Sequence, residues 1–244
     1  MIETLHLHET NSTNDLLQAL VKEKDLDEGS MISTDFQIRG RGVSANVWES
    51  AMGENVLCSI LLCPTFLPIK QQFLISQVVS LAIADVLSSY TQEIYIKWPN
   101  DIYWQDKKIA GILIENNLQN SVIATCIIGI GLNINQTHFQ SQAPNPISLA
   151  QITGAQYDTH AMAKEIRNAI FDRYIQLIKE ETCMLQKEYG SRLYRRTGKF
   201  LFEDKNGKFS ASIDTVTAEG YLILKREDNK MQKYSFKEVS FILP

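Results

Sequence analysis

The sequence predicts an α+β protein: a mixed β-sheet domain with helices packed on one face, followed by a small β-barrel. The first observation is that apolar runs with strand character alternate with segments of helical periodicity over residues 1–190. The second is a change after Gly190, where short strands follow one another and Asn206-Gly207 is a strong hairpin-turn signal. We therefore expect a larger domain at 1–190 and a separate barrel at 191–244.

Each element of the larger domain follows from its hydrophobic period and from start and stop signals. A helix is expected to begin at Ser12 or Thr13, whose hydroxyl can cap the first free N–H groups. Pro68 is typical of a first helical turn and opens a long apolar helix. The polar stretch from Gln37 to Val47 has no period and is expected to be a loop. We expect strands at 1–8, 31–36, 55–63, 94–97, 102–104, 108–115 and 121–135, and helices at 12–24, 68–90, 146–152 and 161–189.

The end of the chain contains the strands of the expected barrel. Turn signals at Asn206-Gly207 and from Glu227 to Lys230 separate short segments of strand character. About five such strands in roughly fifty residues are typical of a small barrel. We expect them at 198–203, 208–217, 220–226, 231–236 and 238–243.

The bulk composition is that of an ordinary folded protein, since 44% of the 244 residues are hydrophobic and 21% are charged. The formal net charge of −4 gives no overall basic surface for nucleic acid. The N-terminus lacks the features of a signal peptide, and no apolar run reaches the roughly 20 residues that span a bilayer. The four cysteines form no CxxC pair and are interpreted as reduced thiols. We therefore expect a cytoplasmic protein without a membrane partner.

Two histidines near the N-terminus, His6 and His8, would share one face of the first strand. Such a pair can in principle bind a metal ion. Because the sequence shows no third ligand beside them, we interpret both as surface histidines.

Four segments combine residue types that suit an anionic ligand. The first is Ser12-Thr13-Asn14 at a helix start, where hydroxyls and free N–H groups form a polar nest, although capping alone explains such residues. The second runs from Gln37 to Gly42 and includes Arg41 between two glycines, with Trp48 downstream. Because a glycine-flanked arginine can wrap an anion, we interpret this loop as a lid ordered by ligand rather than as a solvated loop.

The third segment, Lys97-Trp98-Pro99-Asn100-Asp101 with the following Lys108-Ile109-Ala110-Gly111, is the most informative. It holds too much aromatic mass for a solvated loop and too much charge for a core strand, which favours a site. Asn100 and Asp101 can hydrogen-bond a ligand or hold Mg²⁺ beside phosphate oxygens. The fourth segment, Gly129 to Asn133, ends an apolar strand, where glycines either let a ligand approach or serve packing alone.

Five motifs in a fixed order resemble those of the biotin protein ligase family. They are Ser-Thr-Asn, Gln-x-x-Gly-Arg-Gly with a later Trp, Lys-Trp-Pro-Asn-Asp, Lys-x-Ala-Gly-Ile-Leu-x-Glu and Gly-x-Gly-x-Asn. The match covers roughly Thr10 to Arg196. The resemblance implies a class II synthetase-like catalytic domain that binds biotin and ATP, and an SH3-like C-terminal barrel. The barrel fits this family by its position in the chain and by its run of short strands, and it carries no motif of the family.

The resemblance implies a reaction in two steps. The biotin carboxylate attacks the α-phosphate of MgATP to give biotinyl-5′-AMP and pyrophosphate. A lysine of a biotin carboxyl carrier protein, such as the acetyl-CoA carboxylase subunit, then attacks the mixed anhydride. The resemblance makes Lys108 and Arg41 the catalytic residues, and it makes Asp101 either the contact to Mg²⁺ or a residue that supports the groups around it. It also implies a biotin site of Ser12, Thr13, Gln37, Gly40, Arg41, Lys108, Gly111 and Gly129, and an ATP or AMP site of Trp48, Asn100, Gly131 and Asn133.

Two departures from the family pattern carry expectations of their own. Relatives often extend the lid as Gly-Arg-Gly-Arg-x-Gly-Arg, whereas this chain continues Val43-Ser44-Ala45-Asn46, so we expect a lid that retains biotinyl-AMP less tightly. Only about ten residues precede Ser12, too few for the DNA-binding winged helix of some relatives. We therefore expect the short form of the enzyme, with no DNA partner, and the resemblance also allows a homodimer.

Two alternatives stay open at this point. A lipoate or octanoate protein ligase or transferase would share the general architecture, although Lys-Trp-Pro-Asn-Asp together with Gly-Arg-Gly favours biotin. A non-catalytic ligand- or nucleic-acid-binding module would use the barrel. Arg41, Lys108 and the negative net charge argue against that second alternative.

Overall fold

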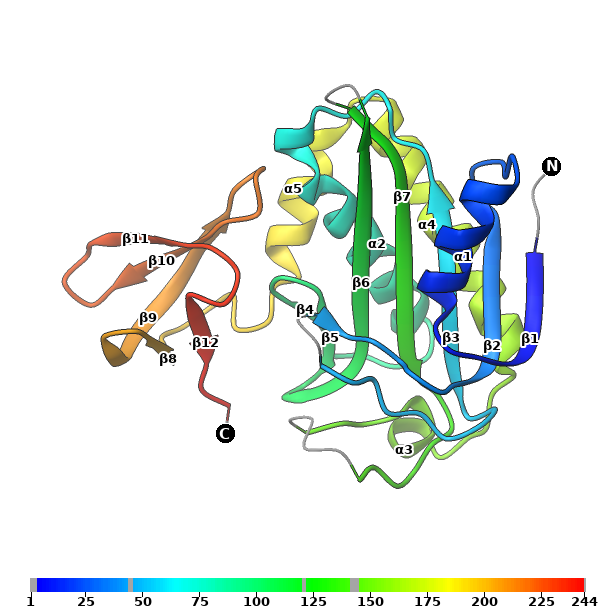
Figure 1. Cartoon of the computed structure of the whole chain (residues 1–244). Helices are drawn as coiled ribbons and strands as arrows, with labels where there is room; N and C mark the ends of the chain where they lie inside the picture. The colour runs from blue at the N-terminus through cyan, green and yellow to red at the C-terminus, as the bar shows by residue number, and fades with distance from the viewer. Residues whose placement is uncertain (1–3, 44–45, 120–121, 141–144, 244) are drawn as a thin grey trace.

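A seven-stranded mixed sheet forms the centre of the larger domain (Figure 1), in a computed structural model that describes residues 4–43, 46–119, 122–140 and 145–243. The strand order is β1-β2-β3-β7-β6-β5-β4, with β1 and β2 parallel and every later pair antiparallel. This confirms the expected mixed sheet. The strands are β1 Thr4–Thr10, β2 Met31–Gln37, β3 Asn55–Leu62, β4 Ile94–Lys97, β5 Asp101–Trp104, β6 Lys107–Gln119 and β7 Val122–Asn133.

Helices cover both faces of this sheet, which refines the expectation that they pack on one face. The apolar helix α2, Phe73–Ser88, and α4, Thr159–Ile178, share one continuous core with one face of the sheet. The shorter α1, Thr13–Glu23, packs on the other face, where Leu17 meets Ile32 and Ile127. Because both faces are covered, all eight residues of β3 are buried.

Two helices differ from their expected extents. The helix expected at 161–189 is divided into α4 and α5, Thr182–Ser191, because Glu180 between them has a positive φ of 60° that ends the first helix. The stretch after Pro68 begins as a 3₁₀ turn, η2 Ile69–Gln71, before α2 starts. A short helix, α3 Leu149–Thr153, begins three residues after the expected start at 146 and ends one residue after the expected end at 152.

One helical stretch, Ile69–Ser88, is long and apolar enough by length and composition to cross a membrane. No unbroken apolar run of that length was expected from the sequence. About two thirds of its most apolar window (67%) lies buried inside the protein. A helix in the core of a folded domain is equally apolar, because apolar side chains surround it on all sides.

The C-terminal part contains the five expected strands in a second, antiparallel sheet of order β11-β10-β9-β8-β12. Figure 1 shows this sheet beside the β4–β5 edge of the first one. The indole Nε1 of Trp98 donates to the carbonyl of Gly220 at 2.9 Å, and Phe73 lies against Gly220, so both residues contact the turn between β9 and β10. The strands are β8 Phe200–Asp204, β9 Gly207–Val216, β10 Leu222–Arg226, β11 Met231–Tyr234 and β12 Val239–Phe241.

Candidate active site

Gly111, Gly129 and Gly131 lie close together on the α1 face of the sheet, because strand pairing brings them there. We call this surface, which carries no side chains of its own, the glycine floor. Gly111 of β6 pairs with Gly131 of β7, and Asp101 of β5 pairs with Gly111 from the other side. Two residues before Gly131 in β7, Gly129 pairs with Ser59 of β3. Residues distant in the sequence therefore meet because their strands are in register, and the glycines leave room above the sheet.

Trp48 lies on this floor. A Cβ atom added to Gly131 would come within 2.3 Å of the indole, and one added to Gly111 within 2.9 Å. The loop that carries Trp48 is fixed by a hydrogen bond from its backbone N–H to the carbonyl of Gly40 at 3.0 Å. The indole Nε1 is buried without a hydrogen-bond partner among the described residues, so this donor remains available to a ligand.

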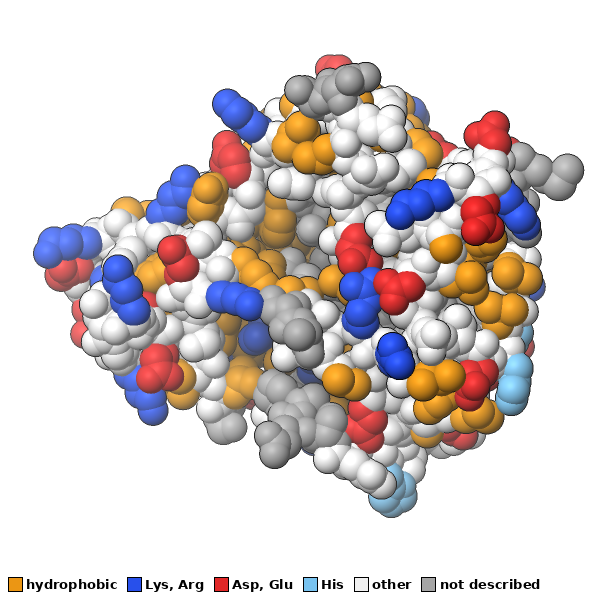
Figure 2. All heavy atoms as spheres, viewed as in Figure 1, with side chains coloured by type: hydrophobic (Ala, Val, Ile, Leu, Met, Phe, Trp, Pro, Cys, Tyr) orange, Lys and Arg blue, Asp and Glu red, His pale blue; other side chains and the backbone are white. Residues whose placement is uncertain are grey.

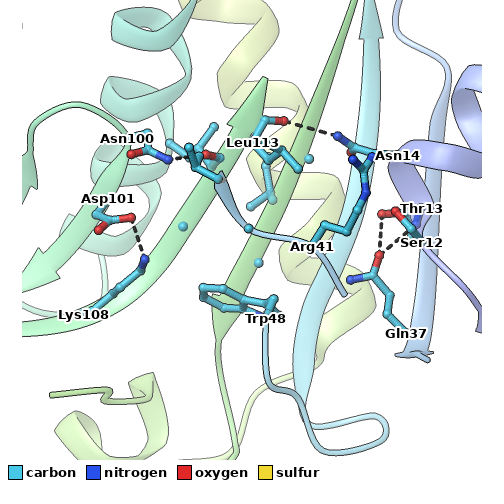
Figure 3. A pocket seen from close by; sticks show the side chains of 17 residues that line it. Ser12, Thr13, Asn14, Gln37, Arg41, Trp48, Asn100, Asp101, Lys108 and Leu113 are labelled. Carbon is cyan, nitrogen blue, oxygen red and sulfur yellow. Dashed lines mark hydrogen bonds and ion pairs between the residues drawn. The ribbon is translucent and has the colours of Figure 1, made fainter. Parts of the chain in front are cut away.

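The start of α1 forms a polar wall beside Gly129. Thr13 donates from its backbone N–H and its hydroxyl to Oε1 of Gln37, at 2.8 and 3.1 Å. The Ser59 hydroxyl donates to Oδ1 of Asn14 at 2.5 Å. Ser12 caps the helix by accepting from the N–H of Asp15, as expected. Figure 3 shows Ser12, Thr13, Asn14 and Gln37 on the opposite side of the pocket from Lys108.

Lys108 reaches the floor because β6 contains a β-bulge. Tyr103 pairs with Lys108, but the preceding Ile102 pairs with Ala110, so Ile109 is the extra residue of β6. A regular strand would turn Lys108 to the face of Ala110, which lies in the core, and the bulge turns it instead to the face of Gly111. There Nζ lies 2.7 Å from Oδ1 of Asp101 and 5.7 Å from the centre of the Trp48 ring.

Arg41 is held by two carboxylates. Its guanidinium donates to both oxygens of Glu115, at 3.0 and 2.9 Å, and to Oδ1 of Asp15 at 2.6 Å. The hydrogen bonds with Glu115 are the main reason that the pKa of Arg41 is raised. Glu115 also accepts from the side-chain amide of Asn14 at 2.7 Å, so the lid arginine is tied to the polar wall.

A second, larger cleft of about 920 Å³ adjoins the glycine floor and extends to the C-terminal sheet. This volume is within the range typical of ligand sites. Figure 2 shows the molecule hollowed between its two parts, with apolar side chains inside. Asn133 lines this cleft and donates to the carbonyl of Ile147, but its buried Oδ1 has no partner among the described residues. Lys97 also lines it, and burial lowers the pKa of this amine.

Most residues proposed from the sequence line one pocket. Gly40 and Asn133 do not line it: Gly40 supports the Trp48 backbone, and Asn133 lies in the larger cleft. Ser44 and Ala45 of the lid lie outside the described residues. The proposed residues that line the pocket are Ser12, Thr13, Gln37, Arg41, Trp48, Asn100, Asp101, Lys108, Gly111, Gly129 and Gly131.

Three residues that were not proposed as site residues from the sequence hold this site together. Asn14 and Glu115 belong to the quoted motifs, and their hydrogen bond joins α1 to β6. Ser59 is the one hydroxyl residue of β3, lies within its apolar run from Val56 to Leu62, and is fully buried. A lone hydroxyl in such a run is the signal that could have identified it, because buried hydroxyls need a partner.

The comparisons with known proteins agree with this arrangement. A sequence profile described as the biotin/lipoate A/B protein ligase family matches residues 7–133, just over half of the chain. The chain belongs to this family. The matched region contains the strands of the glycine floor, the lid and the start of α1.

Family members from distant organisms align over most of the chain. The "Bifunctional ligase/repressor BirA" of Bacillus spizizenii is 27% identical over 224 residues, which is 85% of this chain and 65% of that protein. "Biotin--protein ligase 2" of Arabidopsis thaliana is 28% identical, covering 91% of this chain and 69% of the plant protein. The chain thus spans about two thirds of the length of these relatives.

The fold is also that of a solved family structure. The biotin protein ligase from Aquifex aeolicus, in complex with biotin and ATP, matches with a TM-score of 0.82 and 23% identity. The match covers 100% of both chains, so it includes the C-terminal sheet as well as the larger domain.

Proposed function

We propose that this protein is an ATP-dependent ligase that joins biotin to a lysine of a biotin carboxyl carrier protein. In the first step an oxygen of the biotin carboxylate bonds to the α-phosphorus of ATP, and pyrophosphate leaves. In the second step the neutral lysine amine attacks the carbonyl of biotinyl-5′-AMP. The amide forms, AMP leaves, and the amine loses a proton.

One observation carries this proposal: Lys108 lies where the two ligand spaces meet. The pocket over the glycine floor and the larger cleft share Lys108, Trp48 and Asn100 in their walls. The first step must bring two anions together, a carboxylate and a triphosphate. A cation fixed at the junction of the two spaces offsets their repulsion and the charge that develops between them.

The polar wall and the glycine floor suit biotin. Ser12, Thr13 and Gln37 offer hydroxyl and amide groups to the polar part of the ligand. Gly111 and Gly129 line the pocket without side chains of their own, and the atoms directly above them belong to Trp48, Lys108 and Asn14. The rest of the ligand would lie between these side chains. We therefore keep the biotin assignment of this pocket, with Gly40 supporting the lid.

The larger cleft suits the nucleotide. Trp48 offers a ring face, and its N–H and the Oδ1 of Asn133 have no hydrogen-bond partner among the residues that the structure describes. Asn100 and Gly131 would border the AMP part. Asp101 has one oxygen on Lys108, and a single carboxylate beside phosphate oxygens is the kind of site at which Mg²⁺ binds, so we keep it as the contact to MgATP.

Ligand-dependent stability tests this proposal. We expect biotin and MgATP together to raise the melting temperature well beyond either ligand alone, because the tightly bound adenylate forms only from both. A ligand at 100 times its Kd stabilises a protein by about 2.7 kcal/mol. Biotin, and not lipoate, should also support exchange of labelled pyrophosphate into ATP. Exchange that depends on lipoate and not on biotin would contradict the biotin assignment.

The lid sequence gives a separate prediction. Because Val43, Ala45 and Asn46 replace the later arginines and glycine of the family pattern, we expect biotinyl-AMP to dissociate faster than from a lid with that pattern. The triple variant Val43→Arg, Ala45→Gly, Asn46→Arg restores it within the same chain. Two added cations should slow dissociation of the anionic adenylate, measured by chasing labelled biotinyl-AMP with unlabelled ligand. Equal off-rates would show that these positions do not retain the intermediate.

A further inference from the structure

Three of the four histidines of the chain gather around one carboxylate. His6 and His8 lie on β1, Asp35 lies on the neighbouring β2, and His160 lies in the first turn of α4. Nε2 of His6 is 3.2 Å and Nε2 of His160 is 3.5 Å from the same oxygen, Oδ1 of Asp35. The other oxygen, Oδ2, is 3.1 Å from Nδ1 of His8. His160 is 154 residues from His6 in the sequence, so the sequence alone does not place it beside the two N-terminal histidines.

Two of the three ligand-to-ligand distances agree with those of a tetrahedral metal site. Zinc–nitrogen and zinc–oxygen bonds of about 2.0–2.2 Å place neighbouring ligands of a tetrahedral ion about 3.3–3.5 Å apart. The two nitrogen–oxygen distances to Oδ1 of Asp35, 3.2 and 3.5 Å, match this separation. One ligand atom from each of His6, Asp35 and His160 lies within 4.8 Å of both others. These are the only three such residues that meet this criterion in the described part of the chain.

The surroundings hold the ligands in place. The Nδ1 atom of His6 is 3.0 Å from the hydroxyl of Ser33, which leaves Nε2 directed at Asp35. Partners of this kind orient metal-binding histidines in known sites. The rings of His6 and His160 are 3.9 Å apart between centres, although one is on the edge strand and the other on a helix. Two imidazoles and one carboxylate form a donor set that suits divalent transition metals such as zinc.

This cluster is separate from the ligase site. His6, Ser33 and Asp35 are on the face of the sheet that α4 covers, and Thr159, His160 and Ala163 of that helix border the same hollow. The glycine floor lies on the α1 face. Because β1 is an edge strand that pairs only with β2, an ion held here would join this edge to α4.

We propose that His6, Asp35 and His160 bind a divalent transition-metal ion of the zinc type, which ties the edge strand to helix α4. The two imidazole Nε2 atoms and Oδ1 of Asp35 are the protein ligands. Water completes the coordination, and His8 contacts the second oxygen of Asp35. The site acts in stability, and the ligase reaction does not require it.

Titration of the purified, metal-stripped full chain with Zn²⁺ or Co²⁺ tests the site. Calorimetry should give one Zn²⁺ per chain, Zn²⁺ should raise the melting temperature, and Co²⁺ should give the visible absorption of a low-symmetry site. The variants His160→Ala and Asp35→Asn should each weaken binding at least tenfold, about the minimum loss seen when even a supporting residue of a metal site is removed.

The matched control is His138→Ala, since His138 is exposed, lies outside the cluster and hydrogen-bonds its neighbour Thr137. We expect this variant to bind Zn²⁺ like the unaltered chain. If His160→Gln, which keeps a polar side chain at the helix start, binds Zn²⁺ as tightly as His138→Ala, the proposal is overturned. Melting curves without metal identify any variant that fails to fold. None of these readouts depends on biotin or ATP, so they are independent of the proposed ligase function.

Discussion

The variant Lys108→Ala is expected to form biotinyl-AMP roughly 100 to 1,000 times more slowly, the usual loss when one fixed donor to developing charge is removed. The amine of Lys108 lies at the junction of the two ligand spaces, 2.7 Å from Asp101. Without it the carboxylate of Asp101 faces the incoming anions alone. The loss should appear in the rate of adenylate formation, measured as biotin-dependent pyrophosphate exchange at saturating substrates.

The neighbouring Lys107→Ala is the matched control. Lys107 is exposed and lies just outside the bulge that turns Lys108 to the glycine floor. It should exchange pyrophosphate at the normal rate. Both variants should keep the melting temperature close to that of the unaltered chain, because neither side chain belongs to the core. Near-normal turnover of the folded Lys108→Ala protein would show that its role is misassigned.

The second large effect is expected from Gly129→Ala, a change of one methyl group. The added Cβ would lie 2.4 Å from Oδ1 and 2.9 Å from Cγ of Asn14. Asn14 cannot easily move away, because it is buried and bonds both Ser59 and Glu115. Overpacking of this kind costs about 1–3 kcal/mol. We expect lower stability and biotin binding weakened by about tenfold or more, since the polar wall must shift.

Gly190→Ala separates this effect from a general effect of replacing glycine. Gly190 lies within α5, and a Cβ there has no neighbour within 4 Å. Alanine in a helix is more stable than glycine by roughly 0.5–1 kcal/mol, so this variant should be slightly stabilised. Denaturant unfolding and biotin titration of both variants check the pair. If both behave alike, close contact at Gly129 does not limit the biotin site.

Much of the fold could be predicted because the hydrophobic period of each segment indicates by itself whether the segment is a strand or a helix. The strands of both sheets were predicted to within a few residues, and Ser12 caps α1 as expected. The division between α4 and α5 could not be predicted from the sequence. The positive φ that separates them is at Glu180, and glutamate is not a residue type that signals a positive φ. The side of the sheet on which α1 packs also depends on contacts between distant segments.

The candidate site was predictable as a set of motifs but not as a geometry. The pairing of Gly111 with Gly131 and with Asp101 follows from strand register, which no single segment contains. The bulge that turns Lys108 to the pocket is likewise set by its partner strand. The ion pair of Arg41 with Glu115 joins residues 74 positions apart. In each case the missing information was which segments lie side by side.

Transfer of biotin to a carrier domain is the most direct test of the central claim that this chain is a biotin ligase. Purified protein, biotin, MgATP and a biotin carboxyl carrier domain are mixed, and the carrier is probed for covalent biotin by mass spectrometry. A carrier whose acceptor lysine is replaced by arginine serves as the control. The proposed function predicts the mass of one biotinyl group on the intact carrier, none on the control, and none without ATP. A carrier that stays unmodified, with ATP and biotin saturating and the protein folded, would contradict it.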